Sequence, residues 1–514
     1  MTGPQHGRDD VFNPGARGKG NQDMSIGPGT ISANAGRTPV LIASSEIAPY
    51  AKTGGLGDVM ASLPAALAKL GMNVSLVMPA YSSVLSGGYR FESSDIHVHV
   101  RVADRVESAD VIKSRTKDGL PIYFVRADRY FDRDFLYGTP DGDYRDNAER
   151  FVFFSRATLE LARQLRPSVL HVNDWQTSLA IAFLRSQPDR YPELASVKTV
   201  ITIHNLGYQG RFQAAEWRIL DLDRSLFSPR YLEFYGTVNF LKGGIVFADA
   251  ITTVSPTYAE EIKTREQGFG LEGVFQERAD RLHGILNGVD YGVWNPQTDP
   301  FIAKQYSVRN IKGKMSCARD LRTYFGLADQ KRTPIIGMIT RLSTQKGLDL
   351  VRDALDELLR LGCQFALLGS GDRELQESFE ELGKEYKGKV GVEIGFSESL
   401  AHRIIAGSDI MLMPSRYEPG GLTHLYGLKY GTIPVARATG GLKDTVIPFQ
   451  AETATGNGFV FSSYDADHLA SAVTSAIEAY RQKATWARLV RNAMLSDFSW
   501  DLSAQAYIDI YTKL

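Results

Sequence analysis

The sequence predicts an α/β protein made of two Rossmann-like, doubly wound domains that face a cleft. Short, almost continuously apolar runs alternate with amphipathic helical patterns, which is typical of parallel strands covered by helices on both faces. The same order of strand, glycine-rich turn and helix also occurs in both halves of the 514-residue chain. A chain of this length is expected to form roughly two to four domains.

In the first half, the ordered part begins with a strand at 39–46. A glycine-rich turn follows at 52–58, and the next strand covers 73–78. The helix between turn and strand has apolar residues three or four positions apart, and Gly71 ends it. These apolar positions are Val59, Leu63, Leu67 and Leu70. The segment is therefore predicted to be a β-turn-α-β unit.

The second half repeats this order. A strand at 334–340 leads through a basic turn at 341–347 into a helix, and a further strand covers 364–368. The apolar face of that helix consists of Leu348, Val351, Leu355 and Leu358. Later strands are predicted at 410–413 and 433–436, each followed by a glycine-rich turn.

The ends of the chain and the division between its halves can also be predicted. Residues 1–37 are rich in Gly, Pro, Asn and Ser without periodicity, which predicts a disordered tail. The turn-rich stretch 284–295 is the expected domain boundary. A last helix is predicted from about Asp501, and its apolar positions are Leu502, Ala506, Tyr507, Ile510 and Leu514.

The composition excludes several classes of protein. Lys and Arg together number 58 and Asp and Glu 59, so the basic excess expected of a nucleic-acid-binding protein is missing. Two cysteines, Cys317 and Cys363, do not make a disulfide framework. No apolar run is long enough for a membrane span, and no targeting signal is apparent at the N-terminus. A cytoplasmic protein without membrane or nucleic-acid partners is expected.

Three turns carry groups suited to a phosphorylated ligand, and each follows a predicted strand, where ligands of open parallel sheets bind. In the turn at 52–58, glycines let the backbone approach a phosphate, Lys52 adds a charge, and the next helix offers free N–H groups. The alternative is an ordinary tight turn, because the spacing matches neither G-x-G-x-x-G nor the P-loop.

The second of these turns, 341–347, holds two cations. Arg341 could grip a diphosphate with its planar fork, and Lys346 could follow the charge as a bond breaks. Two solvated surface charges are the alternative interpretation.

The third turn, 414–423, combines a carboxylate with glycines at the start of a helix. Glu418 could accept hydrogen bonds from sugar hydroxyls, and Gly420, Gly421 and Thr423 could offer N–H groups to a phosphate. A simple helix start is the alternative.

Two strands of the first half also end in polar residues. Asp174 and Trp175 follow the strand that starts at Val169, and His204 follows the strand that starts at Val200. A histidine at a strand end is often structural, but this one is predicted to face the cleft. Metal chemistry is not expected, because Asp-x-Asp strings lie in polar stretches and no His/Cys cluster occurs.

Several longer motifs carry a resemblance that extends from Pro39 nearly to the end of the chain. They are KTGGLGDV (52–59), HVNDWQTSL (171–179), TIHNLGYQGRF (202–212), TTVSPTYAEEI (252–262), GILNGVD (284–290), TRLSTQKGLDL (340–350), EPGGLTHLYGLKYGTIPVARATGGLKDTV (418–446) and FSWDLSAQAYIDIY (498–511). In these motifs the chain resembles bacterial glycogen synthases and plant starch synthases, which form glycosyltransferase family 5.

The resemblance implies a fold of the glycosyltransferase B type. It implies an acceptor domain at 38–285, a nucleotide-sugar domain at 286–490, and a C-terminal helix at 491–514 that returns to the first domain. The implied reaction transfers glucose from ADP-glucose to the non-reducing end of an α-1,4-glucan, glycogen or a malto-oligosaccharide, with retention of configuration. No metal or other cofactor is implied.

The resemblance also implies roles for single residues. The diphosphate-binding cations match Lys52, Arg341 and Lys346. The glycine beside the donor phosphates matches Gly55, and the carboxylate that holds the donor glucose matches Glu418. His204 matches the histidine beside the reacting sugar. Further contacts to the substrates match Asp58, Asp174, Asn205 and Asn287. Gly421, Leu422 and Thr423, at the start of the helix after Glu418, are also expected to bind substrate.

Three positions depart from the family's pattern. Gly420 replaces a common Cys, and His424 replaces a common Gln. Phe396 stands where a Tyr often stacks on adenine, and it keeps the ring without the hydroxyl. None of these changes removes a charge, so activity is still expected.

Three alternatives stay open at this point. The same fold could use UDP-glucose or make a small glucoside. A Rossmann dehydrogenase is disfavoured because G-x-G-x-x-G is missing. A non-catalytic glucan-binding protein is disfavoured by the presence of Lys52, Arg341, Lys346 and Glu418.

Overall fold

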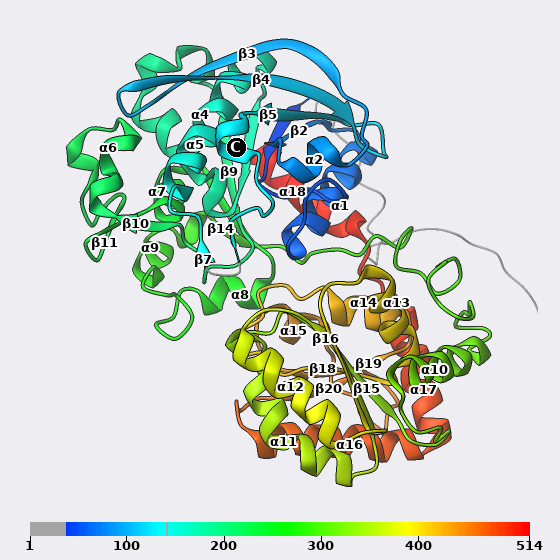
Figure 1. Ribbon diagram of the computed structural model, residues 1–514. Helices are drawn as coiled ribbons and strands as arrows, with labels where there is room; N and C mark the ends of the chain where they lie inside the picture. The colour runs from blue at the N-terminus through cyan, green and yellow to red at the C-terminus, as the bar shows by residue number, and fades with distance from the viewer. Residues whose placement is uncertain (1–37, 140–141) are drawn as a thin grey trace, which may run out of the picture.

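The computed structural model describes residues 38–139 and 142–514 and confirms the predicted α/β architecture. A nine-stranded and a six-stranded sheet, each with its helices, form two lobes that meet end to end (Figure 1). We call them the first lobe and the second lobe. The predicted tail at 1–37 lies outside the described residues. Among the helices of the described part, none is long and apolar enough to cross a membrane.

The first sheet has the order β14-β13-β9-β8-β1-β2-β5-β4-β3, and β14 to β5 run parallel. Its parallel strands are β1 (Pro39–Ala43), β2 (Asn73–Pro79), β5 (Pro121–Arg126), β8 (Val169–Asn173), β9 (Lys198–Ile203), β13 (Ala250–Thr253) and β14 (Leu282–Gly284). The strand order reverses next to β1, whose neighbours are β2 and β8. The loops after β1 and β8 therefore flank a switch point, where α/β proteins bind ligands.

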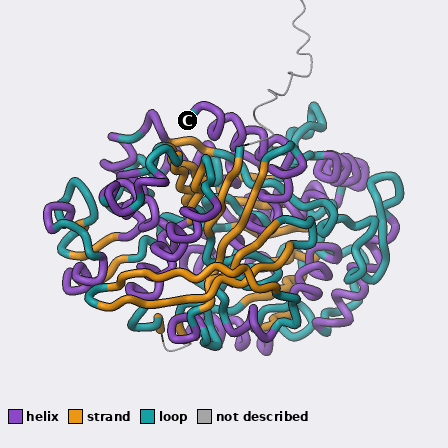
Figure 2. The backbone as a smooth tube through the Cα atoms, turned by 90° about the horizontal axis from the view of Figure 1, so that it is seen from above, coloured by secondary structure: helices purple, strands orange, loops and turns teal. Residues whose placement is uncertain are grey.

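Two long antiparallel strands at the edge of this sheet were not predicted. They are β3 (Glu92–Val102) and β4 (Arg105–Arg115), which cross the top of the first lobe (Figure 2). Val98, Val100 and Val102 are buried, while the residues between them are exposed. This alternation is the signature of a sheet with one solvated face.

The second sheet is entirely parallel, in the order β17-β16-β15-β18-β19-β20. Numbered along the chain, this is the Rossmann order 3-2-1-4-5-6, with the switch point between β15 and β18. The strands are β15 (Ile335–Ile339), β16 (Gln364–Gly369), β17 (Val390–Ile394), β18 (Ile410–Met413), β19 (Ile433–Arg437) and β20 (Phe459–Phe461).

Helices cover both sheets, and most of them follow a strand along the chain. In the first lobe the main ones are α1 (Gly55–Lys69), α4 (Asn147–Leu165), α5 (Asp174–Ser186), α7 (Phe240–Phe247) and α8 (Pro256–Glu261). In the second lobe they are α10 (Lys312–Phe325), α11 (Leu348–Arg360), α12 (Arg373–Glu385), α13 (Glu398–Gly407), α14 (Thr423–Lys429), α15 (Gly440–Thr445), α16 (Ala466–Arg481) and α17 (Lys483–Leu495). Gly71 ends α1 as predicted, with a left-handed φ of 95° that suits glycine.

The last helix, α18 (Trp500–Lys513), packs into the first lobe beside α1 (Figure 1). The hydroxyl of Tyr511 lies 2.7 Å from Nδ1 of buried His171. The predicted apolar face was wrong in part, because Leu502 is 80% exposed. Tyr507 and Ile510 are buried as predicted, and the other buried side chains are Trp500, Ser503, Ala504, Ile508 and Tyr511. The face of α18 that contacts the first lobe therefore includes tyrosines and small residues, which a search for apolar positions alone does not find.

Candidate functional site

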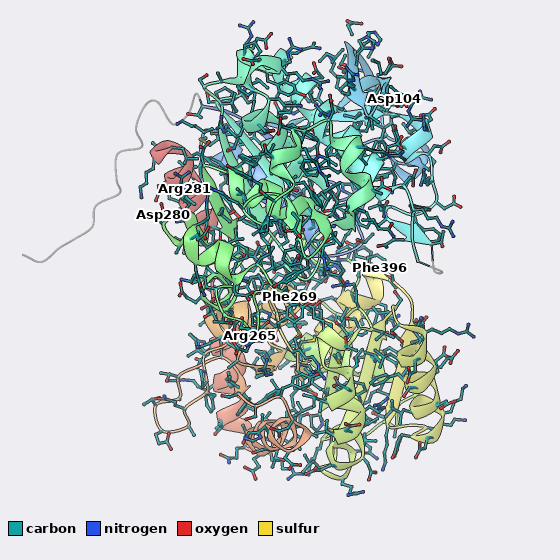
Figure 3. All side chains as sticks on the ribbon, turned by 90° about the vertical axis from the view of Figure 1, so that its left-hand side faces the viewer. Asp104, Arg265, Phe269, Asp280, Arg281 and Phe396 are labelled. Atoms are coloured by element: carbon teal, nitrogen blue, oxygen red, sulfur yellow. The ribbon has the colours of Figure 1, made fainter. Side chains whose placement is uncertain are left out.

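Loops at the carboxyl ends of both sheets meet where the lobes face each other. A Cβ placed on Gly55 would lie 3.7 Å from Cδ1 of Leu422, which packs against the cores of both lobes. Nζ of Lys52 lies 5.7 Å from the ring centroid of Phe396, which stands 76% exposed at the junction (Figure 3). The structure thus brings together residues that the sequence placed on separate turns.

A buried carboxylate that the sequence analysis did not single out holds the glycine-rich turn. Glu46 accepts hydrogen bonds from the backbone N–H of Thr53 at 2.6 Å, from the Thr53 hydroxyl at 2.7 Å and from the N–H of Gly54 at 3.3 Å. The hydroxyl of Tyr137 donates to the same carboxylate at 2.8 Å. The sequence signal that could have identified Glu46 is its position, as a carboxylate between the first strand and the glycine-rich turn.

Lys52 and Asp58 form an ion pair across this turn, with Nζ 2.6 Å from Oδ1. Burial raises the pKa of Asp58, and the Lys52 ammonium opposes that rise. Asp58 lies in the first turn of α1, where the helix dipole favours a negative charge. The pair keeps Lys52 in place at the junction.

In the second lobe, Lys346 and Glu418 form a buried ion pair. Nζ of Lys346 donates to Oε1 at 2.9 Å and to Oε2 at 2.6 Å, and the Ser415 hydroxyl donates to Oε2 at 2.8 Å. Burial by itself would raise the pKa of Glu418, but Lys346 and Ser415 outweigh it and the pKa lies below its usual range. Glu418 is therefore held as a carboxylate in one orientation.

Arg341 reaches the first lobe. Its Nη1 donates to the hydroxyl of Tyr208 at 2.7 Å, and its Nη2 donates to Oε1 of Gln345 at 3.4 Å. Buried Gln345 also accepts from Nδ2 of Asn205 at 3.4 Å and donates to the carbonyl of Tyr417 at 3.2 Å. Tyr208, Gln345 and Tyr417 were not predicted as site residues, because these contacts link residues far apart in sequence.

The two glycines after Glu418 have different surroundings. A Cβ on Gly420 would lie 2.9 Å from Nδ2 of Asn287, so these predicted residues are neighbours. Gly421 has a left-handed φ of 67°, and a Cβ there would lie 3.1 Å from Cγ of Glu418. Helix α14 then begins at Thr423. Glycine is favoured at 421 by its left-handed conformation, whereas a side chain at 420 would first meet the side chains of Asn287 and Val254.

His204 and Asp174 lie side by side in the first lobe. The backbone N–H of His204 donates to Oδ1 of Asp174 at 2.7 Å, and its Nε2 lies 2.9 Å from Oδ1 of Asn173. Burial lowers the pKa of His204 to about 3 and raises that of Asp174 to about 7. Asp174 has a left-handed φ of 54°, the kind of backbone strain found at functional sites.

His424, one of the departures, is fully buried. Its Nε2 lies 2.6 Å from Oγ1 of Thr445, and its Nδ1 has no hydrogen-bond partner among the described residues. Burial lowers the pKa of His424 to about 4, so the ring is neutral beside the Lys346–Glu418 pair.

A cavity of about 210 Å³ lies between the lobes beside the Lys52–Asp58 pair. Its wall includes Glu398, Leu422 and Tyr426 from the second lobe. In the part of the chain that the structure describes, no group of three or more His, Cys, Asp or Glu side chains could hold a metal ion.

Two family models match the chain, one in each lobe. The starch synthase catalytic domain matches residues 39–277, and glycosyl transferases group 1 match residues 325–493. The chain is 45% identical over 476 residues to a glycogen synthase of Syntrophotalea carbinolica, covering 92% of this chain and 98% of that protein. It is 46% identical over 478 residues to a glycogen synthase of Anaeromyxobacter sp., covering 92% and 99%.

Solved structures agree with these relatives. The catalytic domain of starch synthase IV from Arabidopsis thaliana, bound to ADP and acarbose, superposes with a TM-score of 0.86 at 36% identity and covers 93% of this chain and 99% of that chain. Sucrose-phosphate synthase from Thermosynechococcus elongatus, at 17% identity and a TM-score of 0.57, shares the fold. The identity, coverage and fold together show that the chain belongs to the glycogen and starch synthase family of glucosyltransferases.

Proposed function

We propose that the enzyme transfers glucose from ADP-glucose to the non-reducing end of an α-1,4-glucan, with retention at the anomeric carbon and without a metal ion. The observation that carries this proposal is the position of Lys52, whose Nζ lies 5.7 Å from the Phe396 ring of the second lobe, the lobe that also holds the buried Lys346–Glu418 ion pair. The bound ADP and acarbose of the related starch synthase support an ADP-linked donor and a glucan-like acceptor.

The cations act on the leaving diphosphate. Cleavage of the bond between glucose and phosphate builds negative charge on the diphosphate, so fixed positive groups stabilise the transition state more than the ground state. Arg341 and Lys346 supply this charge in our proposal, with Lys52 and the turn before α14 assisting. Gly55 and Gly421 let the backbone approach the phosphates closely.

Glu418 positions the sugar and does not attack it. Both of its oxygens are bound by Lys346, and Ser415 binds one of them again, which lowers the pKa and makes the carboxylate a weak nucleophile. A donor phosphate oxygen therefore accepts the acceptor's proton while the acceptor attacks from the same face. Detection of a glucosyl ester on Glu418 by mass spectrometry would contradict this role.

His204 offers a hydrogen-bond acceptor to the donor glucose. Nδ2 of Asn173 donates to the carbonyl of Ala43 at 3.1 Å, so Oδ1 faces His204 and accepts from Nε2. The ring is neutral because its pKa is lowered to about 3, and Nδ1 is then left unprotonated. Nδ1 accepts from a sugar hydroxyl in this scheme.

The lobes divide the substrates between them. The donor binds mainly the second lobe (286–490), and the acceptor binds mainly the first (38–285 with the C-terminal helix). Reaction requires both lobes, because Lys52 and Asn205 belong to one and Lys346 to the other.

The decisive experiment measures nucleotide release from ADP-glucose and from UDP-glucose with glycogen as acceptor, with and without EDTA. We expect release of ADP at least tenfold faster than release of UDP, unchanged by EDTA. Faster turnover of UDP-glucose would replace the donor in this proposal, and loss of activity in EDTA would replace its metal-independent chemistry.

A further inference from the structure

A row of aromatic side chains, three from the first lobe and one from the second, leads away from the site. Its outer end is Tyr235, in the tight turn between β11 (Glu233–Phe234) and β12 (Thr237–Asn239), where the side chain is 78% exposed. The Tyr235 ring lies 4.8 Å from that of buried Phe234, at an interplanar angle of 85°. Phe234 thus supports an aromatic ring that faces solvent.

The next member is Phe269, on the loop between α8 and α9 (Glu272–Glu277). A Cβ on the neighbouring Gly270 would lie 2.8 Å from Cζ of Phe234 and 3.3 Å from Cε2 of Tyr235, so this loop packs directly on the outer pair. Phe269 is 38% exposed and lies where the loop approaches the second lobe (Figure 3). Its ring lies 5.1 Å from that of Tyr417 in the second lobe.

The inner end of the row reaches the diphosphate-binding loop. The hydroxyl of Tyr417 would be 2.5 Å from a Cβ on Gly207, so the two loops are in close contact. The following residue, Tyr208, accepts the hydrogen bond from Arg341. Tyr235, Phe269, Tyr417 and Tyr208 are therefore linked, contact by contact, to Arg341.

This row is suited to a sugar chain. Exposed apolar side chains that form a contiguous patch mark ligand-binding grooves, and the flat faces of aromatic rings can pack on the C–H faces of glucose units. Polar groups accompany the rings, since the Arg211 guanidinium lies 5.0 Å from the Phe234 centroid and Tyr208 and Tyr235 carry hydroxyls. Because the row ends at Tyr208 and Arg341, it directs a sugar chain lying along it toward the site.

We propose that Tyr235 and Phe269 form an outer binding track for the α-1,4-glucan acceptor. The inference rests on the proposed function and extends it to the length of acceptor that the enzyme prefers. The inner rings contact any acceptor, whereas Tyr235 contacts only chains long enough to extend beyond Phe269. The track therefore favours long chains over short oligosaccharides.

The test compares wild type with Tyr235→Ala and Phe269→Ala, using maltotriose and glycogen as acceptors. We expect Tyr235→Ala to raise KM for glycogen at least threefold, with KM for maltotriose, KM for the donor and kcat unchanged. Phe269→Ala should raise KM for glycogen further. Tyr324→Ala, an exposed tyrosine on α10 of the second lobe, is the matched control and should change none of these values.

Binding without turnover separates the track from the chemistry. In native gels containing glycogen, wild type should be retarded and Tyr235→Ala should run measurably faster. Equal retardation of wild type and Tyr235→Ala, or no retardation of wild type, would overturn the track. So would a KM that Tyr235→Ala raises equally for maltotriose and for glycogen. Absence of nucleotide release by wild type, with the difference in retardation intact, would instead contradict the proposed function.

Discussion

The carboxylate of Glu261 in the first lobe accepts a hydrogen bond from the backbone N–H of Gly440 in the second lobe at 3.1 Å. The reverse contact is also present, since Asp444 accepts from the N–H of Thr257 at 2.9 Å and from its hydroxyl at 2.6 Å. Each carboxylate thus lies at the N-terminus of the partner helix, α15 or α8, and caps it across the lobes.

Glu261→Ala is expected to lower the free energy of unfolding by about 1 kcal/mol, the usual cost of a lost cap. It should also lower kcat several-fold. Gly440, which Glu261 holds, is followed by Gly441, and the N–H of Gly441 donates to the carbonyl of Glu418 at 3.0 Å, so the contact helps to position Glu418. Urea unfolding and initial rates measure the two effects. Glu260→Ala, at the exposed neighbour, is the control, and an identical response of the two variants would refute the role of this contact.

Lys346→Ala is expected to lower kcat by about 10²–10³-fold, the typical cost of removing a group that stabilises transition-state charge. The substitution also leaves buried Glu418 without its ammonium partner, so the pKa of Glu418 should rise. Steady-state kinetics with saturating donor give the result, and Lys384→Ala on exposed α12 serves as the control. A kcat within threefold of wild type would remove Lys346 from the mechanism.

The glycines at 420 and 421 should respond differently to alanine. Gly420→Ala meets the side-chain amide of Asn287, so we expect a several-fold higher donor KM and a stability change within about 0.5 kcal/mol. Gly421→Ala forces alanine into a left-handed conformation that costs about 1–2 kcal/mol and presses on Glu418. Urea unfolding and the donor KM of the two variants test this difference. Equal destabilisation by Gly420→Ala and Gly421→Ala would contradict it.

Asp174 should make the protein less stable as the pH rises. Its pKa is raised from 3.8 to about 7 by burial, so between these values the folded chain holds a proton that the unfolded chain releases. The stabilisation is fully present below about pH 4 and is lost as the pH rises through 7.

The measurement is the free energy of unfolding of wild type and Asp174→Asn from pH 5 to pH 8. Wild type should lose more than about 1 kcal/mol relative to the variant, since one unit of pKa difference corresponds to about 1.4 kcal/mol. Asp189→Asn, at an exposed residue of a short 3-10 helix, should show the same pH dependence as wild type. A constant difference between wild type and Asp174→Asn would show that the carboxyl does not titrate in this range.

The parallel strands and the turns after them could be predicted because apolar runs and glycines are local signals. Lys52, Lys346 and Glu418 follow strands, and the topology of parallel sheets places such residues at one edge. The contacts of Glu46 with Thr53 and of Arg341 with Tyr208 could not be predicted in this way, since they depend on loop conformation and on how the lobes meet. Leu502 was misplaced because α18 buries a face that contains two tyrosines, one of which, Tyr511, hydrogen-bonds to His171 in the core.

The return of α18 determines the order in which the lobes can be completed during synthesis. The core of the first lobe includes Trp500, Tyr507 and Tyr511, whereas the core of the second lobe needs nothing beyond Phe498. Ribosomes add roughly 5–20 residues per second from the N-terminus, so the second lobe has all of its core residues before the first does. The half of the enzyme that is made first is therefore the half that is finished last.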